Sequence, residues 1–251
     1  MCKDFINRIR HKWTKMRLQP IRVLCFHEVS DVDEGSPDWI PIDFLKEELI
    51  RMRQQGYQFI TLKEAHEHIR KDKIRTAKYA VLTADDGLRC HLELLPWLEE
   101  QDIPITLCLN VISPQQKKCG KPYVDWYNIN DEQTEQKYAE RLYISEEELN
   151  GLNSEYVSFA LHGENHNEAA TDLSAEELQR DIELCLEKYE DNARFVPFYV
   201  YKYGKHTKGT DMIVRRNNLI PVLSDGAKNY NDVSVIHREI IENIYKKCQS
   251  K

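Results

Sequence analysis

The chain of 251 residues is long enough for one large domain or two small ones, and its composition, 41% hydrophobic and 31% charged, is that of a soluble globular protein. Its net charge of −7, with no basic block in the body of the chain, argues against a nucleic-acid-binding protein, because phosphates require clustered Lys and Arg. The seven cysteines are scattered, with no CxxC pair, which indicates free thiols in a reducing compartment.

The N-terminal residues predict a basic amphipathic segment over 1–19, ahead of a single domain over 20–251. Two interpretations are open: a helix docked on the domain or a frayed tail, and a helix that contacts an anionic membrane surface through residues 3–18. No signal-peptide region follows and no run reaches the length of a membrane span, so we expect a cytoplasmic protein, peripheral at the inner membrane face if the helix binds lipid. The apolar positions at helical spacing are Phe5, Ile9, Trp13 and Met16.

From residue 20 onward, strand-like and helix-like runs alternate. Strands separated by helices predict an α/β fold with about seven parallel strands. We expect a distorted (β/α) barrel in preference to an open sheet, although periodicity alone does not decide between the two. Three helices carry a capping-box pattern at their start, at Thr61, Ser145 and Ser174. The expected strands are 21–26, 57–60, 78–83, 105–109, 156–161, 197–201, 220–223 and 234–240, and the expected helices are 43–55, one from 61 or 62, 88–101, 145–152, 174–190 and 208–218.

Two short polar motifs each follow an apolar strand. The first is Thr83-Ala84-Asp85-Asp86-Gly87. Adjacent residues that leave a strand point in different directions, so one carboxylate can bind a metal while its neighbour does not. The alternative is an acidic turn that caps the next helix.

The second motif is His162-Gly163-Glu164-Asn165-His166. Residues four apart lie on one face of a helical turn, so both imidazoles can reach one cation, as in the HExxH helix. The alternative is a pair of surface histidines at a helix start, and the motif alone does not decide between the two.

Together the two motifs predict a hydrolytic metal site, because the carboxyl ends of parallel strands share one edge of the sheet. A His, His and Asp ligand set leaves positions open for water and substrate, which is typical of a catalytic site. A divalent metal is therefore expected; the ligands suit Zn, and Co, Ni, Mn or Fe are compatible with them. A carboxylate beside the metal can take a proton, so the expected chemistry is hydrolysis of an amide or ester.

The sequence resembles the polysaccharide deacetylases of the NodB-homology type, a group of carbohydrate esterases. That family has the motifs TFDDG, HSxxH or HTxxH, and RxPYG or YPYG. This chain has the two motifs above in the same order, followed by Tyr201-Lys202-Tyr203-Gly204. The resemblance extends to the LxYHxV start, here Leu24 to Val29, and to Gly56-Tyr57-Gln58-Phe59-Ile60-Thr61-Leu62, and so covers about residues 20 to 240.

The resemblance implies a role for each matching residue. Asp85 would be the general base, and Asp86, His162 and His166 would bind the metal. The backbone N–H of Tyr203 would help to hold the oxyanion.

The resemblance also implies a histidine that acts as general acid after a late strand. His237 is the best candidate, and His27 and His206 compete with it. The alternative for His237 is a solvated histidine near the C-terminus.

The chain departs from the family pattern at several positions, of which four stand out. Ala84 replaces the usual Phe, and Lys202 replaces the usual Pro. Val200 lies where many members carry an Arg that steadies the catalytic Asp, although members with YPYG also lack that Arg. Glu164 between the two histidines is unusual.

The resemblance implies a metal-dependent hydrolase that removes an acetyl group from an N-acetylated sugar, in a saccharide or a lipid-linked glycan precursor. Two alternatives are an O-deacetylase or amidase with a non-sugar substrate, and a non-catalytic saccharide-binding protein of the same fold. The long polar segment 113–143 carries Tyr123, Trp126, Tyr127 and Tyr143, which would either stack on a sugar ring or anchor the segment to the barrel.

Overall fold

The structure is a computed structural model that describes residues 18–31, 38–111, 143–164 and 169–250. The expected N-terminal helix, most of the aromatic segment 113–143 and His166 lie outside these residues. None of the five described cysteines forms a disulfide. No described helix has both the length and the apolar character of a membrane span.

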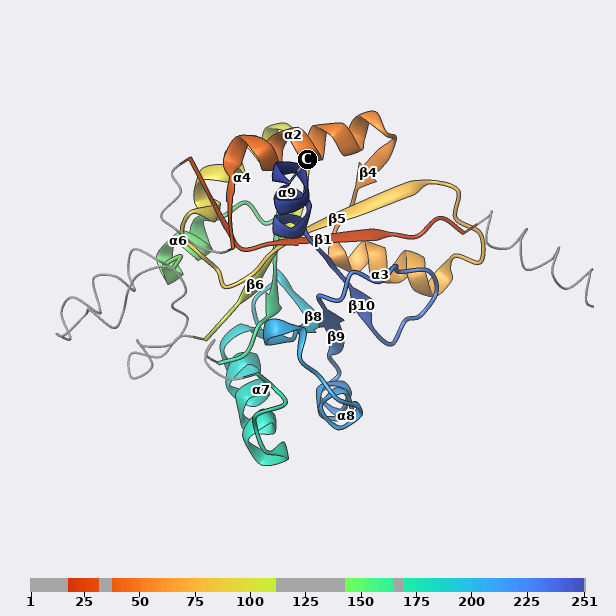
Figure 1. The fold of residues 1–251 in the computed structure, drawn as a ribbon. Coiled ribbons are helices and arrows are strands. Elements are labelled where there is room, and N and C mark those ends of the chain that lie inside the picture. The colour runs from red at the N-terminus through yellow and green to blue at the C-terminus, as the bar shows by residue number, and fades with distance from the viewer. Residues whose placement is uncertain (1–17, 32–37, 112–142, 165–168, 251) are drawn as a thin grey trace, which may run out of the picture.

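A nine-stranded parallel sheet forms the centre of the molecule (Figure 1). Its strands run in the order β10-β9-β8-β7-β6-β5-β1-β11, and β4 pairs with β5. All of these strand pairs are parallel, as the alternation of strands and helices predicts. The bounds are β1 Arg22–Phe26, β4 Tyr57–Phe59, β5 Lys78–Ala84, β6 Ile105–Leu109, β7 Val157–Leu161, β8 Phe195–Val200, β9 Ile220–Leu223, β10 Ile236–His237 and β11 Glu239–Ile240.

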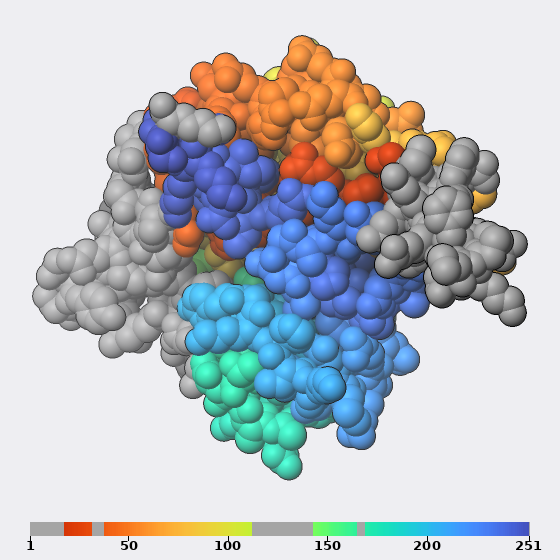
Figure 2. Space-filling view, turned by 45° about the vertical axis from the view of Figure 1, so that its right-hand side comes forward, coloured from red at the N-terminus to blue at the C-terminus, as the bar shows by residue number. Residues whose placement is uncertain are grey.

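A single C-terminal segment joins the two edges of this sheet. β10 pairs with β9, and β11 pairs with β1, while only Arg238 separates β10 from β11 in the chain. Figure 2 shows these C-terminal residues, in blue, between the orange N-terminal elements and the cyan residues near 200. The sheet therefore closes into a distorted barrel, which confirms the predicted (β/α) barrel.

The helices surround the barrel, with α2, α4 and α9 above the sheet in Figure 1 and α7 and α8 below it. The capping boxes predicted at Thr61, Ser145 and Ser174 are all present, and Thr207 forms one more with Thr210. Each satisfies backbone N–H groups that the first helical turn leaves unpaired. The bounds are α2 Ile42–Gln54, α3 Leu62–Lys71, α4 His91–Glu100, α6 Glu146–Gly151, α7 Ala175–Tyr189, α8 Lys208–Arg216 and α9 Ile241–Gln249.

The structure differs from the expected elements in several places, and one of them is the expected strand 234–240, which is divided at Arg238 into β10 and β11. A short parallel pair, β2 Glu28–Ser30 and β3 Trp39–Pro41, follows β1, and α9 follows the barrel closure. Helix α4 begins at His91, not at residue 88, because the N–H of His91 donates to the carbonyl of Leu88 and closes a turn there. Leu88 also forms a β-bridge with Tyr143. These short or turn-bounded elements lack the long periodic pattern that identifies the others.

The barrel interior is filled mainly by small and branched apolar side chains, which come from β1 and from β5 to β10. One buried cluster joins Val81, Cys108, Ala160 and Val222 to the inner face of α3. Alternate residues such as Leu82 instead pack outward under the helices. The filled interior leaves the polar residues that follow the strands at one rim of the barrel.

Candidate active site

The turn after β5 separates two neighbouring carboxylates. Asp86 and Gly87 both have left-handed backbone conformations, with φ of 70° and 64°. A Cβ at Gly87 would lie 2.8 Å from a methyl carbon of Leu109, and together with the positive φ this favours glycine. A positive φ at a non-glycine residue is strained and typical of functional turns. Asp85 and Asp86 are both buried, and they have different partners.

Asp85 is held by a buried arginine from the barrel closure. Nη1 and Nη2 of Arg238 donate to Oδ1 and Oδ2 of Asp85 at 2.6 and 2.7 Å, and the Arg238 side chain is fully buried. Arg238 also donates to the hydroxyls of Thr83 and Ser224. Burial alone would raise the pKa of Asp85, but the charge and hydrogen bonds of Arg238 hold it well below its usual range. Asp85 is thus an oriented, ionised carboxylate.

His27 lies on the other side of Asp85. Its Nε2 is 3.7 Å from Oδ2 of Asp85, while its Nδ1 and its backbone N–H contact Oε1 of Glu242 at 2.9 and 2.7 Å. Burial opposes a charge on this imidazole, but the hydrogen bond and charge of Glu242, helped by Asp85, raise the pKa of His27 to about 10. His27 therefore carries a proton at neutral pH, beside the Asp85 carboxylate.

His162 lies next to Asp86. Its Nδ1 is 2.9 Å from the carbonyl oxygen of Val200, an acceptor that fixes the proton on Nδ1, and its Nε2 is 3.3 Å from Oδ1 of Asp86. A histidine whose Nδ1–H binds a carbonyl presents an Nε2 lone pair, which is the usual arrangement of a metal-binding imidazole. Nδ2 of Asn110 also lies 3.4 Å from this oxygen of Asp86. Asp86 and His162 therefore fit a divalent cation.

The backbone after His162 is not the helical turn that the HxxxH spacing predicted. Gly163 has a φ of 86°, so the chain leaves β7 as a loop, at least as far as the described Glu164. Whether His166 reaches the same cation as His162 stays a prediction, since His166 lies outside the described residues.

A second group of metal-ligand types, Cys25, His27 and Asp85, has donor atoms within 4.8 Å of one another. Metals bind the thiolate form of cysteine, and burial raises the pKa of Cys25 well above its usual range. The thiol instead donates to Oδ2 of Asp85 at 3.4 Å, while Arg238 occupies both oxygens of that carboxylate. We therefore interpret this group as a hydrogen-bonded network, and Asp86 with His162 as the metal-binding pair.

Tyr203 lies in the turn that follows β8. Tyr203 and Gly204 have positive φ values of 57° and 63°, and the Tyr203 side chain is exposed at the rim. Partial burial and the charge of Asp86 raise the pKa of its phenol. Its role as an oxyanion donor stays a prediction.

The two other histidine candidates contact other carboxylates. Nδ1 of His237 lies 2.9 Å from Oδ2 of Asp225, and Nδ1 of His206 lies 3.2 Å from Oδ1 of Asp211. Of the three candidate acids, all within the described part of the chain, His27 is the one for which the structure records a contact with Asp85.

Arg238 is the site residue that the sequence motifs did not reveal. A signal for it was present, because Arg238 interrupts an otherwise strand-like run toward the C-terminus. A charged side chain inside a buried strand requires a charged partner. The sequence alone does not identify Asp85, 153 residues away, as that partner.

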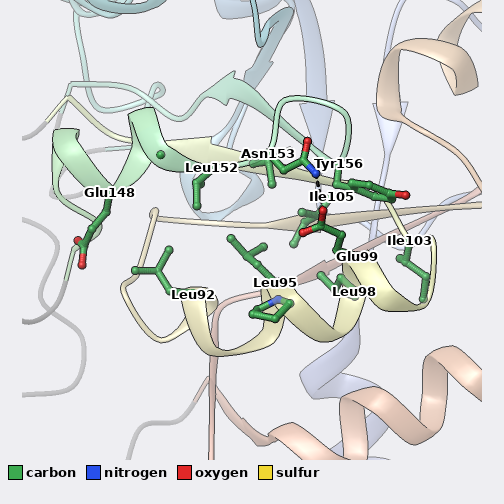
Figure 3. A pocket seen from close by; sticks show the side chains of 13 residues that line it. Leu92, Leu95, Leu98, Glu99, Ile103, Ile105, Glu148, Leu152, Asn153 and Tyr156 are labelled. Atoms are coloured by element: carbon green, nitrogen blue, oxygen red, sulfur yellow. Dashed lines mark hydrogen bonds between the residues drawn. The ribbon is translucent and has the colours of Figure 1, made fainter.

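An apolar cavity of about 430 Å³ lies outside the barrel wall, between α4 and the segment from α6 to β7 (Figure 3). Leu92, Leu95 and Leu152 are among the side chains that line it, and Glu99 accepts a hydrogen bond from Asn153 at its edge. It contains none of the rim residues described above, and its leucines offer no hydrolytic chemistry.

This barrel, with ionisable side chains where its parallel strands end, defines a hydrolase-like α/β protein. A family model described as polysaccharide deacetylase matches residues 72–221. The chain therefore belongs to the polysaccharide deacetylase family, as its resemblance to the NodB-type members predicted.

Solved structures of similar fold agree with that assignment. IcaB from Ammonifex degensii is 18% identical, with a TM-score of 0.64 over 89% of this chain and 92% of its own. The deacetylase PplD from Streptococcus pyogenes, in complex with acetate, is 16% identical, with a TM-score of 0.63 over 91% and 98%. A de-N-acetylase from Aggregatibacter actinomycetemcomitans is 13% identical, with a TM-score of 0.62 over 88% and 94%. No curated protein matches the chain by sequence.

Proposed function

We propose that the protein is a metal-dependent hydrolase that removes the acetyl group from an N-acetylated sugar, in a saccharide or a lipid-linked glycan precursor. The observation that carries this proposal is the division of two adjacent aspartates, with Asp85 bound by Arg238 and Asp86 beside Nε2 of His162. A site that only bound saccharide would have no need of an oriented, ionised carboxylate next to a metal-binding pair. The relatives that are named as deacetylases support the same chemistry.

Asp86, His162 and His166 would hold the cation, with Zn favoured and Co, Ni, Mn or Fe compatible with the same ligands. When bound, a divalent cation polarises the substrate carbonyl and makes an attacking water more acidic. The backbone N–H of Tyr203 would donate a hydrogen bond to the oxygen that becomes negatively charged.

Asp85 acts as the general base in this proposal. Its carboxylate takes a proton from water as the water oxygen attacks the carbonyl carbon of the acetamide. Arg238 keeps the carboxylate ionised and fixes its orientation, so the base is present before substrate arrives.

His27, and not His237, is the general acid that we propose. The C–N bond breaks when the amide nitrogen receives a proton, and the products are acetate and a free amine. His27 carries that proton, because Glu242 raises its pKa to about 10, and it lies 3.7 Å from the base. His237 instead contacts Asp225.

Acetate release from a panel of N-acetylated saccharides tests the proposal. The full chain is stripped of metal with a chelator and assayed with and without added Zn or Co, beside an O-acetylated saccharide and a non-sugar acetamide. We expect release from an N-acetylated sugar that returns with metal. Release only from the O-acetyl or non-sugar substrates would favour the alternative hydrolases, and saccharide binding without release would favour a binding protein.

We also propose that the basic segment 3–18 holds the protein at the inner, anionic face of a membrane in the cytoplasm. Each Lys or Arg near such a surface contributes about 1 kcal/mol, and added salt screens this attraction. The full chain should sediment with anionic vesicles at low salt, and a chain without residues 1–17 should not. This deletion keeps Leu18, which bridges to Arg75. Equal sedimentation of the two chains would contradict membrane binding.

A further inference from the structure

The loop that follows β7 rests on a buried ion pair outside the predicted metal ligands. Nζ of Lys202 lies 3.6 Å from Oδ1 of Asp181, and both residues are buried. Lys202 comes from the turn after β8, and Asp181 comes from α7. Lysine and aspartate are rarely buried in this way unless they are paired.

Asp181 connects this pair to the loop backbone. Its Oδ1 accepts the N–H of Glu164 at 2.8 Å, and its Oδ2 accepts the hydroxyl of Tyr199 at 2.9 Å. The N–H of Glu164 lies two residues after His162. The carboxylate of Asp181 therefore holds the backbone at Glu164, where the described part of this loop ends.

Lys202 occupies the space that a side chain at position 163 would need. A Cβ on Gly163 would lie 2.5 Å from Nζ and 2.6 Å from Cε of Lys202, and 3.2 Å from Oδ1 of Asp181. Two departures from the family motifs thus meet at one contact, since Gly163 stands in place of Ser or Thr and Lys202 stands in place of Pro. The two residues fit one another: the end of the buried Lys202 side chain packs against Gly163, and a side chain at position 163 would force Lys202 away from this place.

We propose that Lys202 and Asp181 are positioning residues that set the path of the loop 162–164, and that Gly163 and Lys202 are a coupled pair specific to this chain. This inference rests on the proposed function, because the property that the loop controls is the geometry of the metal ligands. The pair acts through the backbone and touches neither the metal nor the substrate.

A double-mutant cycle tests the coupling in the full chain. Gly163→Ala, Lys202→Ala and the double variant are titrated with Co²⁺, followed by visible absorption, and the melting temperature of each metal-free chain is measured. Loss of a residue that orients metal ligands typically lowers metal affinity about 10- to 100-fold, and we expect this for each single variant. In the double variant the second change should add much less than its effect alone, because residues in contact are not additive. The double variant should still bind Co²⁺ more weakly than the wild type, since alanine at position 163 is strained at a φ of 86°.

Lys202→Leu fills part of the buried space without Cε, Nζ or the charge, and it replaces Lys202→Ala if the latter does not fold. Arg75→Ala is the matched control, because Arg75 is also buried but binds carbonyls of Gln19 and Tyr230 instead of the rim. It should lower the melting temperature and leave Co²⁺ affinity unchanged.

The outcomes distinguish the inference from the proposed function. Additive effects of Gly163→Ala and Lys202→Ala, or a Lys202 variant with a lower melting temperature and wild-type Co²⁺ affinity, would overturn the inference and leave the proposed function intact. Failure of the wild-type chain to bind Co²⁺ would overturn both.

Discussion

The two halves of the rim are built in different ways. In the half around Asp85, charged side chains meet across the barrel, and the partner Arg238 lies 153 residues away in the chain. In the half around His162, backbone groups fix the geometry, through the carbonyl of Val200 and the N–H of Glu164. The first arrangement controls protonation, and the second controls the direction of the His162 imidazole.

This difference matches the tasks that we propose for the two halves. A general base and a general acid must be in opposite protonation states at the same pH, and Arg238 and Glu242 shift Asp85 and His27 in opposite directions. A metal-binding imidazole instead needs one fixed tautomer, which a neutral carbonyl supplies without adding charge. Substitutions should therefore separate proton transfer from metal binding.

The largest effect on turnover is expected for Asp85→Asn. The amide keeps the shape of the side chain but cannot take a proton, and loss of a general base typically lowers the rate by about 10²–10⁴-fold. Acetate release by the metal-loaded variant measures this loss. Turnover equal to that of the wild type would remove Asp85 from the role of base.

Replacement of Arg238 by Met should have the next largest effect, mainly on stability. The change leaves the buried charge of Asp85 unpaired, and breaking a buried ion pair costs about 3–5 kcal/mol. The lowered pKa of Asp85 stabilises the folded chain at pH values above the usual aspartate pKa, and this contribution disappears as pH falls. The loss of stability in Arg238→Met should therefore be greatest at neutral pH and smaller in acid. Urea unfolding at several pH values measures it.

Arg22→Met is the control for that experiment. Arg22 pairs with Glu239 on the same closing segment, but both side chains are partly exposed. Such pairs contribute about 1 kcal/mol or less. An equal loss of stability in the two variants would show that Arg238 contributes only as part of the barrel closure.

A smaller effect, confined to alkaline pH, is expected for Glu242→Gln. Glu242 holds the pKa of His27 near 10, so the wild-type rate should fall only as pH rises toward that value. Without the charge, the imidazole loses its proton at lower pH, and the alkaline limb of the pH–rate profile should move toward the ordinary histidine pKa of about 6.5. Asp225→Asn removes the matching partner of His237 and should leave the limb in place. If the alkaline limb moved in Asp225→Asn and not in Glu242→Gln, His237 would be the general acid.

Patterns that depend on neighbouring residues predicted much of this structure. The capping boxes at Thr61, Ser145 and Ser174 and the long strands follow from local propensity and periodicity, and the order of the motifs indicated the barrel. The strand-end positions of Asp85 and His162 also placed both at one rim, because parallel strands end together.

The remaining features depend on contacts between distant segments. The strand-like run around Arg238 does not identify Asp85 as its partner. The residues before Arg238 pair with β9 and those after it pair with β1, which only the folded barrel reveals. The turn at Gly163 was expected to be helical from the spacing of two histidines, but the buried Lys202 and the left-handed backbone give it another path. The choice of His237 followed motif order, whereas the contact of His27 with Asp85 requires the fold.

The most direct test of the different roles of Asp85 and Asp86 is the metal content of two variants. Asp85→Asn and Asp86→Asn are purified in parallel, and their metal is measured by mass spectrometry. The division predicts that Asp85→Asn keeps the wild-type amount of metal and that Asp86→Asn loses it, with both chains folded by circular dichroism. The reverse result, metal lost in Asp85→Asn and kept in Asp86→Asn, would contradict the division. It would place the metal instead with Cys25, His27 and Asp85.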